Sequence, residues 1–399
     1  MTFGLILQII FWLAIVALFY IYIGYPLLVY LVSIVFPKKV LKNKFEPKVT
    51  ILITAYNEEK AIRGKLENTL QIEYPKEKFE ILVASDGSND KTDVIVKEFA
   101  KDGVKLFHQA GRKGKTYTQN KAVEKASGEI ILFSDATTAY QPNVLNEILP
   151  NFADESVGCA AGKLIYVDRS NSDVGKGAKS YWNYETFIKE SESRACSLIG
   201  ASGCLYAVRK SAYQPMYAEA CSDFLICTIL YRQGLRSVYE PNAVCFEETN
   251  RQSNKEMRMR VRVISQTFTD LWRNCSMMNP FKSGFYAVEL ISHKLFRYAV
   301  PVFLFLTLII SAILAFSSIF FTAIFLIQIA FYLMALLAKI LEKAGLRLWI
   351  FAIPLYFVLT NIASIIAFYK FLSGERYAAW DTNREQNDNK INALDQSLG

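Results

Sequence analysis

The sequence predicts an α/β domain with a mainly parallel sheet, held between apolar segments that are long enough to cross a membrane. From Pro47 to about Arg273, short strand signals alternate with helical signals. Strands that are separated by helices of this length form parallel sheets. The hydrophobic content of the whole chain is 52%, and the excess lies outside this central region. We therefore expect one domain of cytosolic character with membrane helices at both ends.

The N-terminal segment predicts a membrane anchor. No charged residue occurs between Leu5 and Phe36, and about 20 apolar residues are enough to span a bilayer. The segment is too long and too aromatic for a secretory signal, and no small-residue cleavage site follows it. Residues 24–26, Gly-Tyr-Pro, form a candidate kink. Four lysines follow the segment and put this end in the cytoplasm by the positive-inside rule: Lys38, Lys39, Lys42 and Lys44.

Two further apolar blocks predict the C-terminal membrane region. The block from Ala299 to Ala338 is long enough for a hairpin of two spans, and a third block runs from Leu348 to Phe368. The segment before them mixes aromatic and basic residues, which suits interfacial helices. There, His293 is expected to pack in the interface or to contact a headgroup rather than to bind a metal, because His108 is the only other histidine. The predicted segments are an anchor at 1–38, a cytoplasmic domain at 45–273, interfacial helices at 274–298, two to three spans at 299–370 and a polar tail at 371–399.

Charge and cysteine usage narrow the class of protein. The formal net charge of +8 fits an anionic membrane surface and a phosphate-bearing ligand. Nucleic acid is not expected as a partner, because the chain has no basic helix or recognisable binding module. The seven cysteines are scattered without a CxxC pair. Reduced thiols in a cytoplasmic domain explain them better than disulfides or zinc.

The central domain begins with four apolar strand signals and ends with a weaker fifth. Helical stretches follow the first two strands, and a loop rich in Gly and Lys, "QAGRKGKT", leads into a third helix that ends near residues 126–128. The expected helices after the first two strands cover 58–71 and 90–100. The expected strands cover 48–56, 79–88, 104–108, 129–135 and 156–164.

Polar residues follow three of these strands at the point where each strand ends. Tyr56-Asn57-Glu58 follows the first strand, Asp86-Gly87-Ser88 the second and Asp135 the fourth. Ligands of open α/β sheets bind beyond the carboxyl ends of the strands. Each acid could instead cap the next helix, but three such groups at one edge favour a ligand site.

The residue types at this edge suit a nucleoside diphosphate and a cation. Asp86, in a turn, can accept hydrogen bonds from a base or a ribose. Lys115 can reach a phosphate, and Gly111 and Gly114 let the backbone approach it, although no Walker or GxGxxG pattern is present. Asp135 can bind one divalent cation that stabilises a departing diphosphate. The cation would then take its other ligands from phosphate oxygens and water, as magnesium often does.

These motifs resemble the membrane-bound branch of glycosyltransferase family 2, which has the GT-A fold and includes exopolysaccharide and hyaluronan synthases. The resemblance runs from "ILITAYNEEKAI" to "ISHKLFRYAVP" and "WDTNR". It implies that Asp86 contacts the nucleoside and that Asp135 holds Mg²⁺ or Mn²⁺ on the sugar diphosphate. The second acid of the family's DxD motif is Thr137 here. Further nucleotide-sugar contacts are implied for Tyr56, Glu58, Arg112 and Lys115.

The resemblance also implies a catalytic base and an arginine on the diphosphate. An inverting transfer needs a base for the acceptor hydroxyl, and Asp223 in "EACSDFLICTILYRQG" matches the family's acidic pair, with Ser222 in place of the other acid. A lone Asp at this position is otherwise a helix N-cap. Arg262 matches the arginine of the family's (Q/R)xxRW element, with Met259 and Val263 at the other two positions. The alternative for this stretch is a solvated or lipid-facing basic patch.

The function expected from the sequence is that of a membrane-embedded inverting glycosyltransferase. It would transfer a sugar from a nucleotide-sugar, in the first instance a UDP-sugar, to a growing polysaccharide or a lipid-linked saccharide. Transfer of one sugar to polyprenyl phosphate and a non-catalytic membrane protein that binds sugar nucleotides are the alternatives. The expected location is the cell's inner membrane, in a multi-pass topology with the catalytic domain in the cytoplasm.

The predicted membrane topology contains a conflict about the side on which the C-terminal tail lies. Three spans after a cytoplasmic domain would leave the tail outside, yet "WDTNR", Trp380 to Arg384, resembles an element that the family keeps on the cytoplasmic side. Either one apolar block is re-entrant or interfacial, or the resemblance at the tail is misleading.

Overall fold

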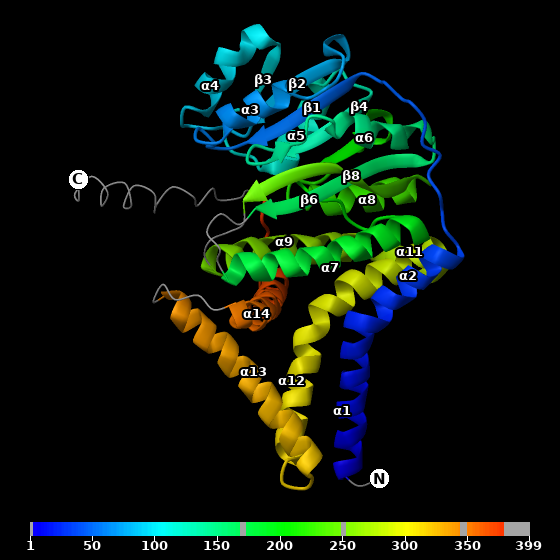
Figure 1. Cartoon of the computed structure of the whole chain (residues 1–399), viewed down its shortest axis with the longest axis vertical. Coiled ribbons are helices and arrows are strands. Elements are labelled where there is room, and N and C mark those ends of the chain that lie inside the picture. Colours follow the sequence, from blue (N-terminus) through cyan, green and yellow to red (C-terminus); the bar gives the residue numbers. More distant parts are fainter. Residues whose placement is uncertain (1–2, 168–172, 249–252, 344–348, 379–399) are drawn as a thin grey trace, which may run out of the picture.

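The computed structural model describes residues 3–167, 173–248, 253–343 and 349–378. Three levels follow one another along its longest axis (Figure 1): an α/β domain, a layer of helices that lie across the axis, and a group of steep helices that ends near the N-terminus. The domain and the steep helices are thus joined through the lying helices, and the predicted Trp380–Arg384 element falls outside the described residues.

The α/β domain is built on one sheet of eight strands in the order β3-β2-β1-β4-β7-β6-β8-β5. β1 is parallel to β2 and β4, β2 to β3, and β6 to β8, whereas β7 and β5 pair antiparallel with their neighbours. The predicted mainly parallel sheet is confirmed. The strands are β1 (Val49–Ala55), β2 (Phe79–Ser85), β3 (Val104–His108), β4 (Ile130–Asp135), β5 (Ala139–Tyr140), β6 (Val157–Val167), β7 (Tyr206–Arg209) and β8 (Arg236–Glu248).

Helices cover both faces of the sheet, which is why its central strands are apolar on both sides. Ile51 and Ile53 of β1 belong to the core on one face, and Leu52 belongs to the core on the other. All three side chains are fully buried. The helices of this domain are α3 (Ile62–Leu70), α4 (Thr92–Glu98), α5 (Lys115–Lys125), α6 (Val144–Ile148) and α8 (Ser222–Arg232).

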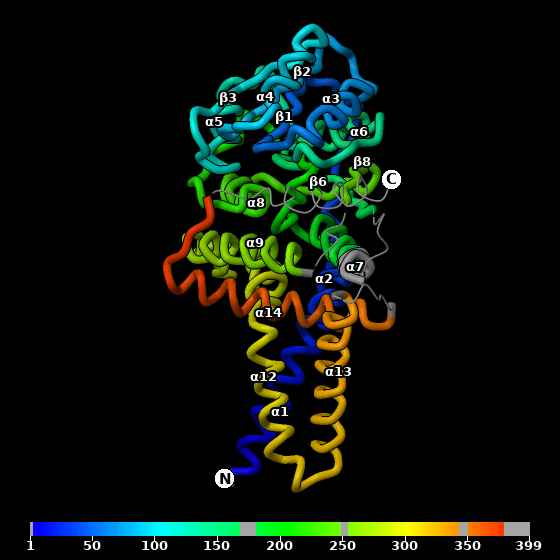
Figure 2. The backbone as a smooth tube through the Cα atoms, turned by 90° about the vertical axis from the view of Figure 1, so that its left-hand side faces the viewer, coloured from blue at the N-terminus to red at the C-terminus, as the bar shows by residue number. Residues whose placement is uncertain are grey.

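A layer of helices separates this domain from the steep helices (Figures 1 and 2). α14 packs against both α9 and α7, and its Ala363 and Ala367 pack against Val261 and Ile264 of α9. These small side chains allow the two helices to approach closely. The layer contains α2 (Tyr25–Val35), α7 (Asp173–Ala195), α9 (Ser253–Arg273), α10 (Pro280–Ser283), α11 (Phe285–Leu290) and α14 (Ala352–Leu372).

The steep helices are α1 (Phe3–Phe19), α12 (Arg297–Leu314) and α13 (Ile319–Lys343). α1 packs on α12 and α13 through Phe11, Ile310 and Phe321. Among the described residues, four helical stretches are long and apolar enough to cross a membrane: Phe3–Val35, Phe285–Leu314, Ile319–Glu342 and Ala352–Leu372. The last of them, α14, lies across the direction of α12 and α13 (Figure 2). This is the geometry of the interfacial alternative that the sequence left open.

Two of the long helical stretches bend at the same level. Residues Tyr20–Gly24 between α1 and α2, and Ile291–Phe296 between α11 and α12, are turns of π-helix. An inserted residue of this kind is a common cause of a sharp kink. The two turns touch, and the Tyr20 hydroxyl lies 2.8 Å from Ser292 Oγ. The kink expected at residues 24–26 is therefore present, and it has a counterpart in the second stretch.

Buried charges fill the junction between α7 and these bends. His293 lies between two carboxylates of α7, with Nε2 2.8 Å from Glu185 and Nδ1 2.6 Å from Glu192. The Tyr25 hydroxyl donates to Glu192 at 2.5 Å, and Arg297 donates to Glu185 at 2.6 Å. His293 is only 2% exposed. His293 is thus buried among side chains of the protein, and its expected place at a membrane interface stays a prediction.

Candidate functional site

The loops that follow β1, β2 and β3 form one connected unit. Asn57 adopts a left-handed backbone (φ 51°), and its amide donates to Ser88 Oγ at 3.1 Å while its side chain accepts from Asn89 N at 2.9 Å. Gly87 (φ 70°) permits the third loop to approach, since a Cβ there would lie 2.6 Å from the carbonyl carbon of Gly111. These contacts hold the predicted ligand edge of the sheet in a single conformation.

Asp86 organises this edge from beneath. Its side chain is fully buried. Oδ1 accepts from the amide of Lys113 at 2.9 Å and from Thr118 Oγ1 at 2.7 Å, and Oδ2 accepts from the amide of Gly114 at 2.9 Å. The carboxylate thus fixes the Gly- and Lys-rich loop and the start of α5. Oδ1 already accepts two hydrogen bonds and Oδ2 accepts one. The nucleoside contact expected for Asp86 would therefore use the remaining lone pair of Oδ2.

Tyr56 and Arg112 meet across two of the loops. The Arg112 guanidinium lies over the Tyr56 ring at 4.1 Å from the centroid, a distance at which a cation and an aromatic face attract each other. The neighbouring Glu58 is fixed through its backbone, whose amide donates to Thr92 Oγ1 at 2.8 Å. The structure therefore gathers three of the predicted nucleotide-contacting residues at the same edge.

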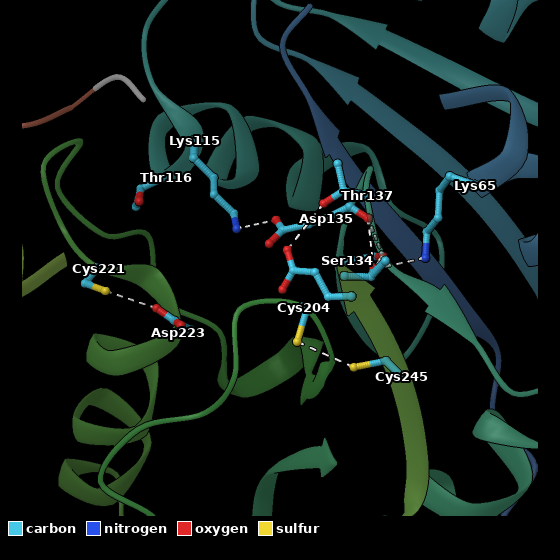
Figure 3. Close-up of polar contacts among 12 residues, drawn as sticks. Lys65, Lys115, Thr116, Ser134, Asp135, Thr137, Cys204, Cys221, Asp223 and Cys245 are labelled. Carbon is cyan, nitrogen blue, oxygen red and sulfur yellow. Dashed lines mark hydrogen bonds and ion pairs between the residues drawn. The ribbon is translucent and has the colours of Figure 1, made fainter. Parts of the chain in front are cut away.

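Lys115, Asp135 and Asp223 come together beside them (Figure 3). Lys115, the first residue of α5, forms an ion pair with Asp135 at the end of β4. Asp223 and the same lysine both lie beside Gly203. A Cβ on this glycine would lie 3.1 Å from Asp223 Oδ2 and 3.6 Å from Lys115 Nζ. Three residues that are far apart in the sequence thus lie close together in the fold.

The two carboxylates beside Lys115 favour the charged form of this lysine. Burial disfavours the ammonium form of Lys115, but the carboxylates of Asp135 and Asp223 outweigh burial and raise the pKa of the lysine. The ion pair remains accessible, because the side chains of Lys115 and Asp135 are 27% and 32% exposed. An anionic ligand or a second cation can therefore reach both groups.

α9 fixes the start of α8, on which Asp223 lies. The buried carboxylate of Asp270 accepts from the amide of Cys221 at 3.0 Å and from the Tyr217 hydroxyl. Burial, with a contribution from the charge of Asp223, raises the pKa of Asp270 to about 8. Asp223 itself accepts from the amide of Phe224 at 3.1 Å. Asp270 is a positioning residue that the sequence did not reveal, since nothing in the pattern of α9 distinguishes it from a solvent-facing acid.

The arginines of α9 face different parts of the molecule. The positive charge of Arg262 is close enough to lower the pKa of Lys115, although the two carboxylates outweigh it, so this arginine borders the site. Arg260 instead pairs with Glu256 at 2.8 Å and lies against the rings of both Tyr181 and Tyr356.

A buried lysine supports the turn that follows Asp135. Lys65 on α3 is 3% exposed. Its ammonium lies 3.4 Å from Thr138 Oγ1 and 3.5 Å from the centroid of the Tyr140 ring. Thr138 in turn donates to the carbonyl of Asp135 at 3.0 Å. Burial lowers the pKa of Lys65 to about 7.

The chain returns to the site after α14. Gln266 of α9 donates to the carbonyl of Tyr377 at 2.8 Å. The next residue, Ala378, lies against the loop before α5, because a Cβ on Gly114 would be 2.0 Å from its carbonyl oxygen. Gly114 also has a φ of 100°, which L side chains rarely adopt. The segment 375–378 thus borders the predicted nucleotide edge.

The residues around Asp135 fit a hard divalent cation only with help from a ligand. Within the described residues, no three or more His, Cys, Asp or Glu side chains gather in a way that could hold a metal. The available donors are oxygens, from Asp135, the Thr137 hydroxyl and Glu247, whose Oε1 accepts from Thr137 Oγ1 at 3.4 Å. Oxygen donors suit Mg²⁺ and Mn²⁺. Glu247 was not predicted, because the strand that carries it was not.

Residues 50–216 match the family model described as "Glycosyl transferase family 2". The chain is 28% identical over 218 residues to the "Probable glycosyltransferase YdaM" of Bacillus subtilis (strain 168), a match that covers 51% of each protein. It is 27% identical over 205 residues to the "Poly-beta-1,6-N-acetyl-D-glucosamine synthase" of Staphylococcus epidermidis, covering 50% of this chain and 49% of that one. The chain therefore spans about half the length of these curated relatives.

The fold is shared with a solved structure over almost the whole chain. The "Mannosyltransferase PcManGT from Pyrobaculum calidifontis in complex with GDP-Man and Mn2+" is similar with a TM-score of 0.69 and 22% identity, over 92% of this chain and 99% of that one. Together with the sheet order and the family match, this likeness identifies the architecture. The α/β domain, which contains residues 50–216, is thus a domain of the glycosyltransferase family 2 type with the GT-A fold, and long apolar helices are attached to it.

Proposed function

We propose that the protein is a membrane-embedded inverting glycosyltransferase that transfers a sugar from a nucleotide-sugar, with UDP-sugars as the first candidates, to a saccharide acceptor. The observation that supports it most is the meeting of Lys115, Asp135 and Asp223 beside the loops that hold Tyr56 and Arg112. The acceptor is a growing polysaccharide or a lipid-linked saccharide, because the site adjoins the layer of helices that we propose to lie at the bilayer surface.

In the proposed reaction, Asp223 removes the proton of the acceptor hydroxyl as this oxygen attacks the anomeric carbon. The new bond is a glycosidic bond, and the bond between the anomeric carbon and the diphosphate breaks, so the nucleoside diphosphate leaves with the electron pair. Lys115 and Arg262 stabilise the charge that develops on the diphosphate. Loops that are held in place before the donor arrives keep these charges oriented throughout the step.

The same proposal assigns Asp135 to a divalent cation, Mg²⁺ or Mn²⁺. When bound, such a cation neutralises negative charge on the departing diphosphate. Its support is the family match of the α/β domain, the oxygen donors at the end of β4, and the Mn²⁺ in the mannosyltransferase of the same fold. Lys115 then pairs with the diphosphate in place of Asp135.

We further propose that three helical stretches cross the bilayer and that α14 lies along its surface. This arrangement puts the α/β domain and residues 375–378 on the same, cytoplasmic side of an inner membrane, in agreement with the lysines after the first span. It is supported by the direction of α14 in Figure 2 and by its contacts with α7 and α9.

A donor screen tests the reaction. Full-length protein in lipid nanodiscs is incubated with UDP-, GDP- and CMP-sugars in the presence of Mg²⁺ or Mn²⁺, and released nucleotide and products are measured. Asp223→Asn should lose turnover by about 10³-fold or more and keep nucleotide binding, since a base acts only in the transition state. The exposed Asp102→Asn is the matched control and should behave as wild type.

The outcomes of this screen test the proposed activity, the role of Asp223 and the identity of the acceptor separately. Absence of nucleotide release from every donor would contradict the proposed function, and full turnover of Asp223→Asn would contradict the role of the base. Mass spectrometry of the product identifies the acceptor. A glycosidically linked or extended product supports a saccharide as the acceptor. A product with a single sugar on a lipid phosphate would instead identify polyprenyl phosphate as the acceptor.

A further inference from the structure

An acidic side chain from another strand reaches the turn that carries Asp135. β8 pairs with β5 so that Tyr140 lies opposite Cys245 and Ala139 opposite Phe246. Continuing this register brings Glu247 level with residues 137–138. The hydrogen bond from Thr137 Oγ1 to Glu247 Oε1, at 3.4 Å, shows that the two side chains meet.

Strand alternation turns Glu247 toward the site and Glu248 away from it. Side chains two apart on a strand lie on the same face, and Cys245 points inward to Cys204, with 3.5 Å between the sulfur atoms. The hydrogen bond with Cys245 and burial raise the pKa of the Cys204 thiol, and the charges of Glu247 and Asp135 raise it further. The two carboxylates thus lie around the same thiol, whereas Glu248 is exposed.

The positively charged side chain of Lys115 already lies at this turn. The Lys115 ammonium forms an ion pair with Asp135. Asp135, the Thr137 hydroxyl and Glu247 together form a set of hard oxygen donors. Such a set is larger than the single carboxylate that the sequence motif offers.

We propose that Glu247 is the second protein carboxylate for the divalent cation of the nucleotide-sugar, in the role of the acid that Thr137 replaces. This inference rests on the proposed function. The Thr137 hydroxyl orients Glu247 by its hydrogen bond, and Asp135 and Glu247 together supply two negative charges. The diphosphate and water provide the remaining oxygen ligands.

Cation binding without turnover tests the proposal. Full-length protein in nanodiscs is titrated with Mn²⁺ in the presence and absence of UDP, and free Mn²⁺ is followed by electron paramagnetic resonance. Glu247→Gln keeps the shape of the side chain and should weaken UDP-dependent Mn²⁺ binding at least about tenfold. Glu248→Gln is the matched control and should bind as wild type does. Thr137→Asp in the Glu247→Gln background should restore most of the affinity, because it returns a carboxylate to the same turn.

Each outcome decides the inference. Wild-type Mn²⁺ affinity in Glu247→Gln, or UDP binding by the wild type that does not depend on Mn²⁺, would overturn it. If Glu247→Gln unfolds, the double variant decides: restored affinity supports Glu247, and lost affinity in a folded double variant refutes it. A wild-type protein that binds no nucleotide, with or without Mn²⁺, would instead refute the proposed function on which the inference rests.

Discussion

Two clusters of charged side chains in this protein contain the same kinds of residue and differ in access. Beside the nucleotide edge, Lys115 and Asp135 form an ion pair whose side chains are 27% and 32% exposed. At the junction with the long apolar helices, Glu185 and His293 form an ion pair whose side chains are 5% and 2% exposed. The first cluster can exchange its partners for a ligand. The second is sealed by α7 and the bends of the long helices, so its charges act only on each other.

The difference teaches that a buried charge cluster is not by itself evidence of a site. Breaking a sealed pair leaves a charge without compensation in a medium of low polarity, which costs stability. Breaking an accessible pair exposes its members to water and costs little, unless a ligand needs them. Substitutions in the two clusters should therefore have opposite effects on stability and on turnover.

The largest effect on stability is expected from Glu185→Gln. Its carboxylate faces both His293 and Arg297, whose attraction outweighs burial and holds the pKa of Glu185 well below its usual range. Loss of this charge should lower the free energy of unfolding by about 3–5 kcal/mol. Turnover per folded molecule should change little, in contrast to Asp223→Asn.

Thermal unfolding in nanodiscs, with activity normalised to folded protein, measures both quantities. Glu190→Gln, half-buried on the same helix, is the control and should leave the unfolding temperature unchanged. Because the folded pKa of Glu185 is depressed, its contribution is present at neutral pH and lost as pH falls through the folded value. A wild-type unfolding temperature for Glu185→Gln would mean that the junction is open to water.

A smaller effect, on the accessible cluster alone, is expected from Gly114→Ala. The new methyl group would meet the carbonyl of Ala378, and the backbone at φ 100° is strained for any L residue. The loop that presents Lys115 must shift, so the KM for the donor should rise about tenfold with a smaller change in kcat. Initial rates against donor concentration measure this.

Gly111→Ala separates contact from strain. Gly111 lies in the same loop with a φ of 70°, but a Cβ there would meet nothing within 4 Å. It should cost about 1 kcal/mol of stability through backbone strain and leave the KM nearer to wild type. Equal KM values for both variants would show that the segment 375–378 does not act on the loop.

The sequence allowed prediction of the parallel half of the fold and of the accessible cluster. β1 to β4 are rich in apolar residues that favour strands, so their strand character is local, and Lys115 and Asp135 follow from where such strands end. β5 and β7 have two and four residues, and β8 contains Pro241. Their pairing depends on distant neighbours and leaves no local pattern. Glu247 was missed with its strand.

The sealed cluster was missed for a different reason. Glu185, Lys189 and Glu192 lie on one face of α7, yet a charged helical face ordinarily indicates solvent. Only the bends of the two long helices bring His293 and Arg297 onto that face. The direction of α14 was equally open, because apolar length does not distinguish a crossing helix from one that lies flat.

The smallest effect is expected from Lys65, which belongs to neither kind of cluster: it is sealed, and Tyr140 and Thr138 contact its ammonium without an ion pair. Burial lowers its pKa in the folded protein to about 7, whereas an unfolded lysine titrates near 10.4. Between these values the unfolded chain binds more protons, so the stability of the wild type should rise as pH increases from 7 toward 10.

Lys65→Met fills the same space without a charge and should remove this rise, with an unfolding temperature a few degrees above wild type at pH 7. Unfolding temperatures across pH 7 to 9.5 measure it, with the exposed Lys97→Met as the control that should keep the wild-type slope. A wild-type slope in Lys65→Met would mean that Lys65 stays charged in the fold and that water or an anion reaches the underside of the Asp135 turn.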